Sequence, residues 1–112
     1  MKQELLLVKI HNGLKDGKSA YEATRKHWRM NTTRHKYIKY VVGLDKKNVV
    51  AVFEPSKWFV VNEGPEEGRS YFEGKEAGRE IQQRVEASSE LLLSKFGTGA
   101  AIAYASLTDL KS

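Results

Sequence analysis

The sequence predicts a single α+β domain in which a small curved antiparallel sheet, or an open β-barrel, carries one or two short helices. The chain has 112 residues, which suits one hydrophobic core, so one domain is expected over residues 1–112. Several short apolar or β-branched segments are separated by turns, as in a sheet of short strands. One segment, from Ser19 to Arg29, has the pattern of a capped helix.

The first strand and the helix follow from residues 4–29. Glu4–Ile10 is a short apolar run, typical of a largely buried strand. Ser19 followed three residues later by Glu22 matches a capping box, so a helix is expected to begin there and to run to about Arg29. Residues spaced i, i+4 and i+7 share one face of such a helix. Three side chains define this face: Tyr21, Arg25 and Trp28.

The other strands are predicted from runs of β-branched and aromatic residues. Residues 37–44 and 48–53 flank Asp45-Lys46-Lys47 and are expected to form a hairpin, whose second strand ends at Pro55. Further extended segments are expected at residues 57–61, 69–74 and 100–107, with a helix inside residues 75–96. A parallel βαβ array is not expected, because few helical segments are available to connect parallel strands.

Composition excludes several classes of protein. The chain has no cysteine, which rules out disulfides, cysteine nucleophiles and cysteine-ligated metal centres. The three histidines, His11, His27 and His35, lack a paired-ligand spacing, so no metal site and no cofactor are expected. No apolar run approaches the roughly 20 residues that cross a bilayer, which predicts a cytoplasmic protein without membrane contact.

Positive charge is concentrated in the first half of the sequence. Residues 1–50 hold nine Lys and three Arg against four acids, whereas residues 51–112 hold four Lys and three Arg against ten acids. A field of positive sign attracts the phosphates of nucleic acid, although small basic domains without such partners are also common.

The first two thirds of the chain resemble a known domain type. The resemblance rests on the run from Tyr21 to Trp28, Arg34, the strands 40–44 and 50–53, Trp58, Arg69 and Phe72-Glu73-Gly74. These residues are similar to a bacterial group without an assigned function and, more broadly, to the PUA-like superfamily of ASCH, EVE and YTH domains. The resemblance implies a small β-barrel that binds RNA, or a modified base in an aromatic-walled pocket. The C-terminal third departs from the group, with only Tyr104 matching its final strand.

A base pocket needs aromatic faces for stacking and Arg or backbone groups for the base edge or the phosphate. If the resemblance holds, the candidates are Tyr21, Arg25, Trp28, Arg34 and Trp58. The alternative for Tyr21 and Trp28 is a core-facing stripe that packs on the sheet, and Trp58 fits the core as well as it fits the pocket. Arg25 has an alternative too, because an ion pair with Glu22 or Glu54 would fix the helix to the sheet.

Three functions follow, in order of preference. The first is a nucleic-acid-binding module that recognises RNA or a modified DNA base, with no catalytic residue. The second is a protein-interaction or regulatory subunit that docks through the apolar run Leu91–Leu93. The third is a small amidohydrolase of ASCH type, which needs a Lys and a Glu that converge in the cleft. The ligand and the oligomeric state are left open by the sequence.

Overall fold

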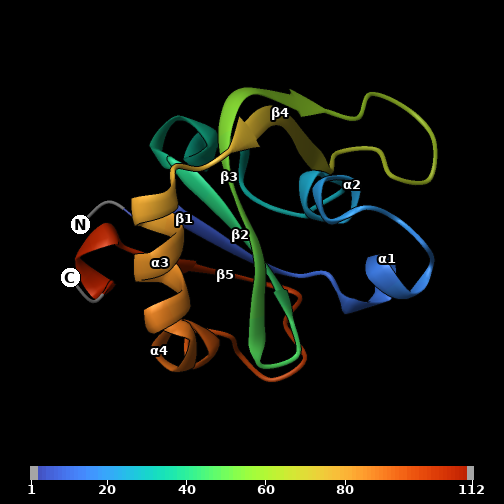
Figure 1. Ribbon diagram of the computed structural model, residues 1–112. Helices are drawn as coiled ribbons and strands as arrows, with labels where there is room; N and C mark the ends of the chain where they lie inside the picture. Colours follow the sequence, from blue (N-terminus) through green and yellow to red (C-terminus); the bar gives the residue numbers. More distant parts are fainter. Residues whose placement is uncertain (1–2, 111–112) are drawn as a thin grey trace.

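The protein is a three-layer α+β structure built around one sheet. The computed structural model describes residues 3–110, and its five strands have the order β4-β3-β2-β1-β5 (Figure 1). The strands are β1 (Leu5–Lys9), β2 (Tyr40–Asp45), β3 (Asn48–Val60), β4 (Ser70–Glu76) and β5 (Ile102–Ala105). The helices are α1 (His11–Lys15), α2 (Ala20–Arg25), α3 (Arg79–Ala87) and α4 (Ser89–Leu93), with 3₁₀ turns η1 (Thr32–Tyr37) and η2 (Leu107–Asp109).

The predicted α+β class is confirmed, but the sheet is mixed rather than antiparallel. β1 and β2 pair in parallel, and the other three strand pairs are antiparallel. One connection of α1, α2 and η1 is enough to bring the chain back for the parallel strand. The sheet ends at β4 on one side and at β5 on the other, so it does not close into a barrel. Four short α-helices, rather than one or two, occur within residues 3–110.

Helices cover both faces of the sheet, which explains the uniformly apolar first strand. Leu5, Leu6, Leu7 and Val8 are all fully buried, because alternate side chains enter opposite layers. One apolar cluster includes Val85 of α3 and Leu92 of α4. The second cluster contains Ala23 of α2 and Phe53 and Phe72 of the hairpin, with Leu14 of α1 packed against it. The parallel pair therefore lies at the centre of the molecule (Figure 1).

The long β3–β4 hairpin extends beyond the central strands. The predicted break at Pro55 is wrong, since β3 continues to Val60 with a register shift between Pro55 and Lys57. Ser56 is the extra residue of the bulge, and the neighbouring Pro55 pairs with Gly74. Prolines inside sheets are found at edge strands and bulges, which fits this position. Residues of this bulge and of α2 together line the site described below.

The helix boundaries differ from the sequence prediction at two places. Ser19 caps α2 as expected, and its hydroxyl accepts the backbone N–H of Glu22 at 3.1 Å. The helix ends at Arg25 rather than near Arg29, because the following segment leaves the helix to pair with β4. The stretch within residues 75–96 forms two helices divided at Ser88. No helix within residues 3–110 is both long and apolar enough to cross a lipid bilayer.

Candidate functional site

The outer edge of β4 is covered by α2 and the segment that follows it. The Gly74 N–H donates to the Tyr21 hydroxyl at 3.1 Å. Arg25 Nε donates to the Phe72 carbonyl at 2.9 Å. Trp28 exchanges both backbone hydrogen bonds with Ser70, each at 2.8 Å.

The spacing of these contacts explains the predicted stripe. Residues three or four apart on a helix are about 4.5–6 Å apart along its axis, and alternate residues of a strand are about 6.6 Å apart. Tyr21 and Arg25 of α2 therefore reach Gly74 and Phe72 of the edge strand, and Trp28, which lies beyond the end of the helix, pairs with Ser70 through its backbone. Only alternate residues of an edge strand turn their peptide groups outward. The three predicted residues therefore cover the outer edge of β4 in addition to packing against the core.

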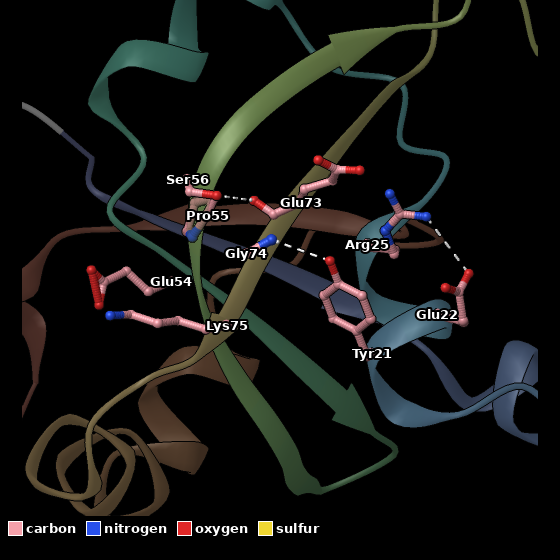
Figure 2. A pocket seen from close by; sticks show the side chains of 9 residues that line it. All are labelled: Tyr21, Glu22, Arg25, Glu54, Pro55, Ser56, Glu73, Gly74 and Lys75. Atoms are coloured by element: carbon pink, nitrogen blue, oxygen red, sulfur yellow. Dashed lines mark hydrogen bonds and ion pairs between the residues drawn. The ribbon is translucent and has the colours of Figure 1, made fainter.

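A pocket of about 730 Å³ opens where α2 meets the hairpin bulge. Figure 2 shows Tyr21 and Arg25 of α2 on one side and residues of β3 and β4 on the other. We call it the α2–hairpin pocket; its lining residues are Tyr21, Glu22, Arg25, Glu54, Pro55, Ser56, Glu73, Gly74 and Lys75. Two of the five residues predicted from the sequence, Tyr21 and Arg25, lie in it.

Arg25 is the most constrained charged group of the pocket. Its guanidinium carbon lies 5.4 Å from the centroid of the Tyr21 ring and 5.6 Å from that of Tyr71. The side chain is only 12% exposed, and Nη1 lies 3.7 Å from a Glu22 carboxylate oxygen. Nε is occupied by the Phe72 carbonyl. Nη1 therefore faces the Glu22 carboxylate, and only Nη2 is left without a hydrogen bond or ion pair to another residue within 3–110.

Gly74 lets the two strands of the hairpin approach closely at the pocket floor. A Cβ at this position would come within 2.8 Å of Pro55 Cα and closer still to the Glu54 carbonyl oxygen. The Ser56 hydroxyl spans the bulge and donates to the Glu73 carbonyl at 3.0 Å. The floor is therefore backbone, and the walls are side chains of both charges.

The two tryptophans are not among the residues that line this pocket. Trp28 donates its indole N–H to the Thr24 carbonyl at 2.8 Å, and Trp58 packs beside Phe72 with ring centroids 5.3 Å apart. The Trp58 ring is also stacked on the His35 ring, with centroids 4.5 Å apart and an angle of 9° between the ring planes. Both indoles are partly buried against the second apolar cluster, which agrees with the core alternative for Trp28.

His35 connects this aromatic group to β4. Its Nε2 lies 2.8 Å from the Oγ of the fully buried Ser70. Burial lowers the pKa of His35 below the ordinary value of 6.5. A neutral imidazole is thus stacked on an indole. The fully buried Ser70 hydroxyl offers no accessible nucleophile for catalysis.

Arg34 lies apart from the pocket. Its Nη1 donates to Gln3 Oε1 at 2.7 Å, and its guanidinium carbon sits 4.0 Å from the Tyr104 ring centroid. Burial raises the pKa of the Tyr104 hydroxyl, and the Arg34 charge opposes this rise. The structure therefore divides the five predicted residues among three places.

Sequence reasoning missed the strand residues of the pocket. Glu54, Ser56, Glu73 and Lys75 come from either side of the hairpin bulge. A proline in one strand and a glycine in the next are typical of a bulge or a close backbone approach. Pro55 and Gly74 were therefore the residues from which the bulge, and with it this part of the pocket, could have been predicted.

Comparison with known proteins gives no relative: no family model, curated protein or solved structure matches the chain. Within residues 3–110, no group of three metal-ligating side chains could hold an ion. Any function must therefore be argued from the site itself.

Proposed function

We propose that this chain is a PUA-like nucleic-acid-binding module that holds one unpaired or modified base of RNA or DNA in the α2–hairpin pocket. The supporting observation is the Arg25 guanidinium, which is held by the Phe72 carbonyl beside the Tyr21 and Tyr71 rings and whose Nη2 has no partner within residues 3–110. A pocket of about 730 Å³ falls within the size range of small-ligand sites. Aromatic rings and a planar guanidinium are the groups on which extruded bases stack.

The charges of the pocket favour a base edge over a phosphate. The lining residues include three carboxylates, those of Glu22, Glu54 and Glu73, and two cations, Arg25 and Lys75. A phosphate would be repelled by this excess of carboxylates. An exocyclic amino group, in contrast, donates well to a carboxylate, as glutamate does toward the cytosine amino group. The pocket therefore suits a base that carries an amino group.

A matched pair of oligonucleotides tests this proposal. Cytosine and uracil differ in the amino group at position 4, so labelled 12-nucleotide C and U homopolymers should bind with different affinity in a fluorescence anisotropy titration. One well-made base contact is worth about 1–3 kcal/mol. We expect roughly tenfold tighter binding of the C homopolymer, and a smaller ratio for Glu73→Gln. Undetectable binding of both oligonucleotides at low salt would overturn the proposal.

Two lysine variants separate the pocket from general charge attraction. Lys75 lines the pocket, whereas Lys47 lies in the exposed turn between β2 and β3. Lys75→Met and Lys47→Met remove the same charge, so a non-specific field predicts equal losses of affinity. The pocket proposal predicts a larger loss for Lys75→Met, and equal losses would count against it.

One observation favours the amidohydrolase as a second candidate. Lys75 and Glu54 are directly opposed on β4 and β3, and Figure 2 shows their side chains extending side by side. A lysine beside a glutamate is the pair of groups that such an enzyme would use. Turnover of small base-like amides, abolished by Lys75→Met, would establish this candidate.

The docking alternative receives no comparable support. Leu91 is 41% exposed, but Leu92 is fully buried and Leu93 packs against the first apolar cluster. The run Leu91–Leu93 therefore presents one exposed leucine rather than a continuous apolar patch.

A further inference from the structure

A second hollow lies on the other side of α2. It has a volume of about 590 Å³ and is bounded by the turn before α2, the end of α2 and the loop that leads into β4. We call it the basic cleft; its lining residues are Gly17, Lys18, Ser19, Glu22, Lys26, His27, Glu66 and Arg69. None of its lysines and arginines lines the α2–hairpin pocket.

Cations outnumber carboxylates in the basic cleft. Lys26 Nζ lies 3.3 Å from Glu22, and Arg69 Nε lies 3.0 Å from Glu66. Lys18 forms no ion pair with any residue within 3–110. Two carboxylates are thus matched by two cations, and the third cation is left over. This is the reverse of the α2–hairpin pocket, where carboxylates are in excess.

The pKa of His27 depends on its burial and on the charges around this cleft. Burial lowers the pKa of its imidazole below 6.5, and the charges of Lys26, Lys18 and Arg25 lower it further. Only the Glu66 carboxylate acts in the opposite direction. Burial is thus the main cause of the lowered pKa of His27, and three cations and one carboxylate act on the imidazole in opposite directions. Ser19 adds a hydroxyl proton, because its oxygen already accepts the Glu22 N–H.

A single carboxylate divides the cleft from the pocket. Glu22 lines both hollows, and its Oε2 lies 3.3 Å from Lys26 Nζ and 3.7 Å from Arg25 Nη1. A ligand that extends past Glu22 would thus contact the α2–hairpin pocket, which suits an amino group, on one side. On the other side it would contact the excess of cations in the basic cleft. Adjacent groups of a nucleotide, its base and its phosphate, have this pairing of properties.

We infer that the basic cleft is a phosphate-binding subsite, formed by Lys18, Lys26 and Arg69, which holds the backbone phosphate next to the base in the α2–hairpin pocket. This inference rests on the proposed function for the identity of the ligand, and on the cleft itself for phosphate binding. Lys26 exchanges its contact with Glu22 for the phosphate, and Lys18 supplies the unmatched charge. Phosphate oxygens accept hydrogen bonds from both lysines and from Arg69.

The cleft is tested with inorganic phosphate alone, by NMR of the backbone amides and of the His27 ring. We expect saturable shifts confined to residues 17–19, 26–27 and 66–69. Bound phosphate should also raise the pKa of His27, because an anion favours the imidazolium. Lys18→Gln should weaken phosphate binding at least fivefold. Lys15→Gln, an exposed site on α1, removes the same charge and should leave it unchanged. Absent shifts, or equal effects of the two variants, would overturn the subsite.

An oligonucleotide experiment distinguishes failure of the cleft from failure of the proposed function. Each phosphate contact contributes about 0.7 to the slope of log affinity against log salt for a single strand. Lys18→Gln should reduce this slope by about 0.7, and Lys15→Gln should not. If the oligonucleotides bind with the same slope in both variants, the cleft inference fails while the function stands. If phosphate binds but no oligonucleotide does, the proposed function fails and the cleft serves a different phosphate ligand.

Discussion

Arg25→Ala should destabilise the fold strongly, although the residue lies at the surface of a pocket. The substitution removes the hydrogen bond from Nε to the Phe72 carbonyl. Such a bond from a charged donor is worth about 1.5–3 kcal/mol. It also removes the guanidinium from between Tyr21 and Tyr71, a contact worth about 0.5–1 kcal/mol. The distant and exposed contact with Glu22 adds almost nothing. We expect a loss of about 2–4 kcal/mol.

Urea denaturation followed by far-UV circular dichroism measures this loss. Arg29→Ala is the matched control, since Arg29 is exposed and lies beyond the end of α2; its change should stay within about 0.5 kcal/mol. Arg25→Lys should fall between the two, because the ammonium keeps the charge but lacks the planar fork. If Arg25→Ala and Arg29→Ala unfold at the same urea concentration, the proposed edge contact does not stabilise the protein.

Three further substitutions or conditions follow from single contacts. Thr24→Val should stabilise the protein by about 1–2 kcal/mol in thermal melts, because the Thr24 hydroxyl is fully buried and finds no hydrogen-bond partner within residues 3–110; a destabilised variant would show that the hydroxyl is satisfied. Gly74→Ala should destabilise the protein by about 1–3 kcal/mol, because the new Cβ would collide with Pro55. This is the opposite of the usual effect, since alanine is normally more stable than glycine in a strand. An unchanged melting temperature would contradict the close approach of the two strands. Because the folded pKa of His35 lies below 6.5, the unfolded chain binds more protons in this range, and the free energy of unfolding should fall as pH drops below about 6.5. His35→Gln should make the free energy of unfolding depend less steeply on pH in this range. An identical pH profile in the variant would show that His35 does not cause the dependence.

The local features of the fold could be read from the sequence. Ser19 predicted the beginning of α2, and the structure shows its capping hydrogen bond. The spacing of Tyr21 and Arg25 predicted a shared face, which the α2–hairpin pocket confirms. Both signals depend on residues within one turn of each other, where geometry follows directly from the backbone.

The pairing of distant strands could not be read in the same way. Nothing within residues 4–10 or 37–44 states that these two strands lie side by side in parallel. The uninterrupted apolar run Leu5–Val8 was the available signal, because a strand covered on both faces shows no alternation of polar and apolar residues. All four of these side chains are fully buried in the structure. The positions of Trp28 and Trp58 also depend on this topology, since stacking on His35 requires η1 to fold over the hairpin.

The covered edge of β4 has a consequence for the behaviour of the protein in concentrated solution. An exposed edge strand offers unpaired peptide groups on which a second chain can add a strand of its own. Here the outward groups of Ser70, Phe72 and Gly74 are occupied by Trp28, Arg25 and Tyr21. Detachment of α2 together with the segment through Trp28 would free all three at once and create a template for intermolecular pairing. Self-association of damaged molecules should therefore start along β4, well before the central strands separate.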